Sequence, residues 1–326
     1  MNRRDFVRSA PWAMGAGALG LSVVLSACQR PVQPIRVASN VWLGYEPMFL
    51  ARELGFLSES VARLVEFPSN TACLTALVNH EVSLGALTLD EFLLAREGGV
   101  DLRAVLVFDE SNGADVVLGG PNVQTLTDLR GKRIGVESSA VGALMLTKLL
   151  DLANLSAADV VKVEVTLERH VEAFRKGQVD AIVTFEPVAS QLVSEGARRL
   201  LDSSRFPGLI VDVLVAHTSD LVREGDQIRQ LLAAYFQALD YWLARPQDAA
   251  RLMAPRLQLT PDQVVSSFGG ISVPDLVGNR AWLTGGRPRL MAAAETVGAI
   301  MQRTHLLKAA PNLAKLCDAS FLPEST

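Results

Sequence analysis

The chain has 326 residues, of which 49% are hydrophobic, 20% charged and 6% aromatic, and its formal net charge is -4. At roughly 100–200 residues per domain this length allows two domains, and the composition is ordinary for a globular α/β protein. The acidic balance and the lack of a basic stripe beyond the N-terminal segment argue against a nucleic-acid partner, and three cysteines are too few for a disulfide scaffold.

The N-terminal segment is typical of an export signal. Arg3, Arg4 and Arg8 precede an apolar stretch that ends near Ala27 and is short for a membrane span, which needs about 20 residues. The following Cys28 completes a Leu-Ser-Ala-Cys run that resembles a bacterial lipobox. The resemblance implies a signal peptide at 1–27, a lipid on the Cys28 thiol and an anchor linker at 28–34. "NRRDFVR" also resembles a twin-arginine motif, so the export route stays open, as does an ordinary buried N-terminal helix.

The first part of the chain alternates strands and helices with short breaks. The pattern predicts strands at 35–39, 83–87, 102–108 and 114–120, and helices from Pro47, at 70–81 and at 89–99. Ser69 or Asn70 caps the second helix, and Gly98 supplies a left-handed residue at the end of the third. Residues 42–46 are expected on a loop at the carboxyl end of the first strand, where α/β sheets bind ligands.

A second series follows Pro121 and repeats this logic. It predicts strands at 131–137, 161–165 and 180–185 and helices at 138–155 and 170–178. Such alternation favours parallel sheets of the α/β class. From about Ser219 the chain becomes nearly all helical, with a long amphipathic helix closed by Arg245-Pro246. We expect this helical region to pack against the first sheet.

Signs of catalysis are few. His80, His170, His217 and His305 are not at metal-ligand spacing, and neither a phosphate loop nor a nucleophile elbow is present. Cys73 lies on the apolar side of its helix, where a thiol acts as a small hydrophobe; it could pair with Cys317 only if the C-terminal tail folds back. Carboxylates near predicted loops (Asp90, Glu91, Asp109, Glu186) remain acid–base candidates. We expect a protein that is not an enzyme and needs no cofactor or metal.

Several motifs in order suggest a family: "VWLGYEPMFLARELGFL", "PSNTACLTALVNHEVSLGALTLDEFLLAREGGVDLRAV", "SNGADVV", "LTDLRGKRIGVE" and "GQVDAIVTFEP". Together with the lipobox they resemble the nitrate, sulfonate, taurine and pyrimidine-precursor group of ABC-transporter solute-binding proteins, over nearly the whole mature chain. The resemblance implies a type II periplasmic-binding fold with two α/β lobes, a cleft and two crossing strands. We place the crossings near Gly119–Asn122 and Asp212–Ala216, with lobe 1 at 35–118 plus 216–326 and lobe 2 at 119–215.

This resemblance also implies a mechanism without covalent chemistry. A ligand that touches both lobes stabilises a closed form, which docks on a membrane permease. The lipid on Cys28 would hold the protein on the periplasmic side of the cell envelope. One alternative is a sensor whose closed form contacts a membrane signalling protein. Another is a pyrimidine-synthesis enzyme, whose cysteine-rich motif and histidines we do not find.

The site residues implied by the resemblance come from the ends of strands and the starts of helices. Helix starts offer unpaired N–H groups to a ligand, although capping alone also explains the Ser69 triplet, and core packing also explains the two aromatic residues. The candidates are Trp42, Tyr45 and Glu46; Ser69, Asn70 and Thr71; Thr88 and Asp90; Glu137, Ser138 and Ser139; and Thr184 and Glu186.

The charge of these loops indicates the ligand class. The candidate loops carry Glu46, Asp90, Asp109, Asp115, Glu137 and Glu186, without Lys or Arg at the same points. Desolvating several carboxylates beside a sulfonate or nitrate is unfavourable. We therefore expect a small nitrogenous solute, either a cation or a rich hydrogen-bond donor, with a sulfonate or nitrate as the alternative. The run "FDESNGADVV" is also similar to members associated with urea- and guanidine-type compounds.

Overall fold

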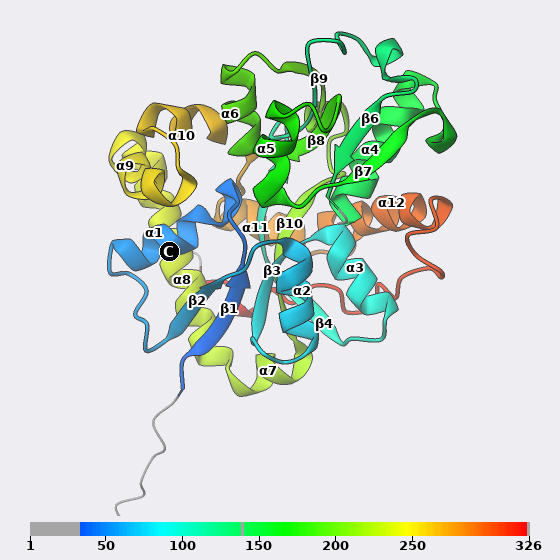
Figure 1. Ribbon diagram of the computed structural model, residues 1–326. Helices are drawn as coiled ribbons and strands as arrows, with labels where there is room; N and C mark the ends of the chain where they lie inside the picture. Colours follow the sequence, from blue (N-terminus) through cyan, green and yellow to red (C-terminus); the bar gives the residue numbers. More distant parts are fainter. Residues whose placement is uncertain (1–32, 138–139, 325–326) are drawn as a thin grey trace, which may run out of the picture. The chain divides into compact units, whose positions relative to one another are not determined.

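The computed structural model describes residues 33–137 and 140–324 (Figure 1). Cys28, Ser138 and Ser139 lie outside the described residues, and so does the expected signal peptide. The region from Gln33 onward forms one compact unit. It contains two sheets, and it confirms the predicted α/β class.

The first sheet has six strands in the order β11-β4-β10-β3-β1-β2. Its parallel part consists of β1, β2 and β3, and β10 joins β3 to β4 in antiparallel pairing. The strands are β1 (Ile35–Ser39), β2 (Ala62–Glu66), β3 (Leu84–Thr88), β4 (Leu102–Ser111), β10 (Val211–His217) and β11 (Ile271–Ser272).

Three helices connect the strands at this end of the chain: α1 (Glu46–Glu53), α2 (Asn70–Val78) and α3 (Leu89–Glu97). Pro47 stands in the first turn of α1, where its missing N–H removes no helical bond. Ser69 caps α2 by accepting a hydrogen bond from Ala72 N at 3.1 Å. The prediction for Gly98 was wrong: its φ is -66°, and the left-handed conformation falls on Gly99, with φ of 86°, one residue further along.

The second sheet repeats the arrangement of the first, in the order β7-β6-β8-β5-β9. Strands β6, β7 and β8 are parallel, and β5 pairs antiparallel with β8 and β9. The strands are β5 (Asp115–Gly119), β6 (Arg133–Val136), β7 (Val161–Glu164), β8 (Ala181–Phe185) and β9 (Arg198–Asp202), with helices α4 (Ala140–Ala153), α5 (His170–Arg175) and α6 (Val188–Ser194).

Helices cover both faces of this second sheet. Along β5, Val117 packs with Met145 and Leu149 of α4, whereas Val116 and Leu118 belong to the cluster on the side of α5 and α6. Because successive side chains of a strand point to opposite faces, a sheet covered twice needs a continuous apolar run. The sequence "DVVLG" meets that need.

The chain passes between the sheets earlier than expected. Since β5 pairs within the second sheet and β10 within the first, the passages lie at residues 112–114 and 203–210 rather than at Gly119–Asn122 and Asp212–Ala216. The backbone N–H groups of Asn112 and Ala114 donate to the carbonyl of Gly270. These bonds hold the first passage against the residue that precedes β11 of the first sheet. The exact lobe boundaries stay a prediction.

The C-terminal region is helical, as predicted, and packs on the first sheet. It comprises α7 (Thr218–Arg223), α8 (Gly225–Ala244), α9 (Pro246–Leu257), α10 (Pro261–Phe268), α11 (Leu276–Leu283) and α12 (Arg289–Arg303). Asn279 of α11 bonds both the N–H and the carbonyl of Val107 in β4. The tail returns to the same strand, where Ala104 N donates to Leu316 O. Arg96 of α3 also holds the tail by donating to the carbonyls of Asn312 and Ala314.

Cys73 and Cys317 are both free thiols. The tail does fold back, with Cys317 next to Ala104, but Cys73 is buried in the core at α2, as expected for a small hydrophobe. Within residues 33–137 and 140–324, none of the helices has the length and apolar character that a membrane span requires.

Candidate functional site

A cavity lies where the carboxyl ends of the strands and the starts of helices converge. Its volume is about 20 Å³, which is room for about one water molecule. Residues of both sheets and their loops line it: Asn40, Trp42, Asn70, Thr88, Asp115, Val141, Phe185, Ile210 and Asp212. This is the position at which open α/β sheets bind ligands.

The turn after β1 shapes one side of the cavity. A short 3-10 helix at Leu43–Tyr45, rather than the expected open loop, carries the chain into α1. Trp42 lies edge-on to Phe185 of the second sheet, with ring centroids 5.6 Å apart, and its Nε1 donates to Asp109 Oδ2 at 2.9 Å. Gly44 is required for this contact, because a Cβ there would lie 1.6 Å from the same carboxylate oxygen.

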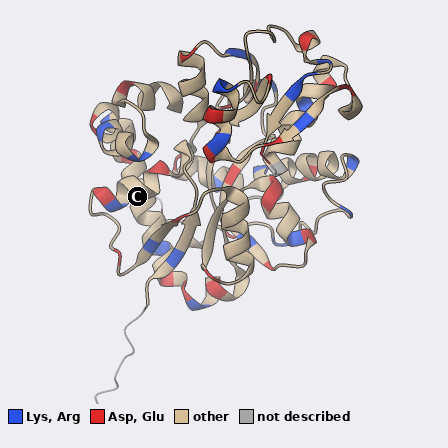
Figure 2. Ribbon diagram, viewed as in Figure 1, with Lys and Arg blue, Asp and Glu red and all other residues tan. Residues whose placement is uncertain are grey.

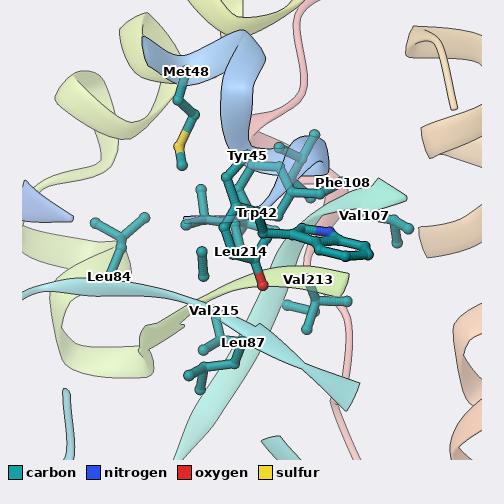
Figure 3. Close-up of a cluster of buried hydrophobic side chains, with 14 of the residues drawn as sticks. Trp42, Tyr45, Met48, Leu84, Leu87, Val107, Phe108, Val213, Leu214 and Val215 are labelled. Carbon is teal, nitrogen blue, oxygen red and sulfur yellow. The ribbon is translucent and has the colours of Figure 1, made fainter. Parts of the chain in front are cut away.

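Tyr45 lies behind the cavity in the core of the first sheet. Its ring packs edge-on against Phe108 at 4.9 Å, among the apolar side chains of Figure 3. Its hydroxyl donates a hydrogen bond to Asp212 Oδ1. Tyr45 therefore both fills the core and orients a carboxyl group that lines the cavity.

Buried carboxyl groups dominate the electrostatics of the site. Asp90, Asp109, Asp115 and Asp212 are each at most 4% exposed. Burial raises the pKa of Asp109 to about 8, of Asp115 to about 7 and of Asp90 to about 6. It also raises the pKa of Asp212 well above the usual range, and Asp109 reinforces that shift. The described residues that line the cavity include no Lys or Arg.

The lining also contains buried oxygen atoms that accept no hydrogen bond from the described residues. Asn40 Oδ1, Asn70 Oδ1 and Asp115 Oδ2 are buried and have no hydrogen-bond partner among the described residues. Buried polar atoms are normally bonded, so an unpaired group in a cavity calls for an explanation such as a ligand. Each of these atoms is an acceptor as placed, so the cavity suits a molecule rich in N–H or O–H donors.

Other predicted residues lie at the edge of the cavity or around it. Ser69 caps α2. Thr71 and Thr88 both donate weakly to Glu91, at 3.4 and 3.3 Å, and Thr88 also lines the cavity. Asp90 lies in the first turn of α3 rather than at the end of β3; that turn carries two adjacent acidic residues (Figure 2). Its Oδ2 is buried without a partner among the described residues.

Three predicted residues point elsewhere. Glu46 pairs with Arg256 of α9. Thr184 shares a hydrogen bond of 3.0 Å with His170. Glu186 accepts from Ser190 N at 2.9 Å and faces a separate polar cavity. Glu137 is half-buried at the end of β6, and its neighbours Ser138 and Ser139 lie outside the described residues.

Sequence reasoning did not select Asn40, Phe185 or Asp212 as site residues, and it used Asp109 and Asp115 only in the charge argument. Asp212 carries a signal that was available: it interrupts the otherwise apolar run "IVDVLVA". A carboxyl group inside such a strand is either paired or functional. Within the described part, no group of three or more His, Cys, Asp or Glu side chains is arranged to hold a metal ion.

A family model described as NMT1/THI5 like matches residues 43–249, more than half of the chain. The chain belongs to the NMT1/THI5-like family. It is similar to a putative aliphatic sulfonates-binding protein of Escherichia coli K12, with 25% identity over 78% of this chain and 80% of the relative. This membership agrees with the family expected from the sequence motifs.

Solved structures of this family's fold match over most of the chain. The alkanesulfonate-binding protein SsuA from Xanthomonas axonopodis pv. citri, bound to MOPS, gives a TM-score of 0.74 at 21% identity, over 88% of this chain and 99% of that one. The fold is thus the two-lobed periplasmic-binding architecture of ABC importer solute-binding proteins. The desulfurization enzyme DszB shares it, with a TM-score of 0.68 at 16% identity over 89% and 97% of the two chains, so the fold alone does not separate binding from catalysis.

Proposed function

We propose that this protein is the lipid-anchored, extracytoplasmic solute-binding component of an ABC importer, that it is not an enzyme, and that its ligand is a small nitrogenous cation or hydrogen-bond donor. The family membership supports the binding role. The observation that carries the ligand class is the cavity lined by Asp115 and Asp212, with unpaired acceptors on Asn40, Asn70 and Asp115.

The charge of the cavity weighs against an anion. A sulfonate placed there would lie beside buried carboxyl groups with no cation in the described lining. An anion can bind there only while these carboxyl groups are protonated, because an ionised carboxylate beside it is a strongly unfavourable like-charge contact in a site of low dielectric. A cation instead gains charge-assisted hydrogen bonds, which are roughly twice as strong as neutral ones.

Sulfonate binding is the second candidate, because the printed names of relatives describe aliphatic sulfonates. A thermal-shift panel of amines, amidines, guanidines, pyrimidines, sulfonates and nitrate distinguishes the two. The protein should start at Gln29, which retains the compact unit from Gln33 onward. We expect stabilisation by the nitrogenous cations or donors and none by the sulfonates. Stabilisation by sulfonates alone would overturn the ligand class.

The lipid anchor is tested separately. Full-length protein expressed in a Gram-negative host should fractionate with membranes and incorporate labelled palmitate. Cys28→Ser should abolish both, because the thiol that carries diacylglycerol is gone. Cys73→Ser serves as the matched control, since that thiol is buried in the core and should receive no lipid. Equal labelling of wild type and Cys28→Ser would refute the anchor.

A further inference from the structure

Asp212, which lines the cavity, faces Asp109 across neighbouring strands. In the antiparallel ladder of β4 and β10, Asp109 is the direct partner of Asp212, and Thr88 of β3 is the next residue in the same row. Directly opposed side chains have Cβ atoms about 4.5–5.5 Å apart, and like charges in such a pair are destabilising. The two residues are 0% and 2% exposed, so solvent water does not screen the repulsion between their charged forms.

Each of the two carboxyl groups is held by a neutral aromatic donor. Trp42 Nε1 donates to Asp109 Oδ2, and the Tyr45 hydroxyl donates to Asp212 Oδ1. These donors fix the orientation of the two groups but bring no positive charge. Asp109 Oδ1, on the other hand, is buried without a partner among the described residues.

The charged and titratable groups that surround the pair are acidic or neutral. Asp115 approaches from β5, Asp90 from α3 and Tyr235 from α8. Glu110, the neighbour of Asp109 on β4, forms an ion pair with Arg289 at 3.7 Å. Arg289 therefore pairs with Glu110 rather than with Asp109 or Asp212. Ionising both carboxyl groups in this setting is unfavourable, so each raises the pKa of the other and the two titrate as a pair.

We propose that Asp109 and Asp212 form one proton-holding pair that releases a proton to solvent when a cationic ligand enters the cavity. This inference rests on the proposed function, in that the ligand is a cation. One positive charge enters and one leaves, so the net charge of the closed cavity is unchanged. Ligand affinity is therefore set by pH: below the range where the pair titrates it rises tenfold for each pH unit, and above that range it is constant.

Proton release is measured by isothermal titration calorimetry in buffers of different ionisation enthalpy. The probes are guanidinium chloride and methylammonium chloride at millimolar concentration, and the protein begins at Gln29. We expect about one proton released per cation bound at pH 6, with an affinity that rises about 100-fold from pH 5 to pH 7. Binding without proton release and with constant affinity would overturn the pair while leaving the proposed function intact.

A second arm needs no ligand. A folded-state pKa above the unfolded value stabilises the fold at low pH, and this contribution is lost as the pH rises through the folded pKa. The pKa of Asp109 rises on folding from the usual aspartate value to about 8. The free energy of unfolding of the wild type should therefore fall as the pH rises from about 5 to about 8. Asp109→Asn and Asp212→Asn should each have a shallower slope. Asp240→Asn, on the exposed side of α8, should match the wild type.

The outcomes of the two arms separate the claims. If neither probe binds but the slopes differ as expected, the pair stands and the ligand class of the proposed function fails for these cations. If all slopes coincide, the folded protein holds no extra proton at the pair, and the inference fails whatever binds. Asp212→Asn is the second variant, in case Asp109→Asn does not fold.

Discussion

Replacing Arg256 by methionine should destabilise the protein by about 3–5 kcal/mol, the usual cost of removing one partner from a buried ion pair. The guanidinium of Arg256 pairs with Glu46, which is 1% exposed, donates to the carbonyl of Asn40 at 3.0 Å and lies 3.5 Å from the ring centre of Phe49. Without it, the buried Glu46 carboxylate has lost its ion-pair partner and keeps only the weaker influence of Arg52. Urea denaturation at pH 8 measures the change, since burial, opposed by Arg256, raises the pKa of Glu46 to about 7.

Arg251→Met is the matched control for this prediction. Arg251 lies on the same helix, α9, but is exposed and pairs with Asp248 within the helix, so its loss should change stability by less than about 0.5 kcal/mol. The double variant Glu46→Gln/Arg256→Met should recover part of the loss, because no buried charge remains. A stability of Arg256→Met equal to that of Arg251→Met would contradict the structural role of the pair.

Asp115→Asn should weaken binding of a cationic ligand roughly 10- to 100-fold, the equivalent of a hydrogen bond to a charged group at about 1.5–3 kcal/mol. Asp115 Oδ2 is buried, lines the cavity and lacks a partner among the described residues. Asparagine keeps the shape and removes the charge. Calorimetry at pH 8 is the suitable measurement, because burial raises the pKa of Asp115 to about 7 and the carboxyl group is then largely ionised.

Asp240→Asn removes the same charge from an exposed position of α8 and should leave the affinity unchanged. An unaltered affinity in Asp115→Asn would show that this carboxyl group does not face the ligand. Tighter binding of a sulfonate by the variant, together with no binding of cations, would favour the hypothesis that the natural ligand is a sulfonate.

Local sequence signals anticipated most of the secondary structure. The strand at 35–39 and the Ser69 cap of α2 appear as predicted, because hydrophobic periodicity and capping act over a few residues. The prediction failed by one residue at Gly98, where two successive glycines offered the same freedom. The predicted positions of the passages between the sheets differ from the observed ones, because the local sequence of a strand does not show which sheet the strand joins.

The sequence predicts that the turn "NVWLGYEP" and its aromatic residues belong to a ligand cleft, and Trp42 lines the cavity. The partners of this turn were not visible from the sequence. Asp109 lies 67 residues from Trp42, Asp212 lies 167 from Tyr45, and Arg256 lies 210 from Glu46. Glu46 was predicted as a ligand contact because it is polar and close to the aromatic pair, but its carboxylate forms an ion pair with Arg256 of α9.

The sequence by itself therefore determined the α/β class, the family and an excess of carboxylates over cations around the expected cleft, since these depend on local pattern and composition. Only the tertiary structure decided which carboxylates meet. Strand pairing sets Asp109 opposite Asp212, and the second sheet brings Asp115 and Phe185 to the same cavity. The physical reason is that burial and charge proximity, which govern the protonation of these groups, arise only when distant segments of the chain pack together.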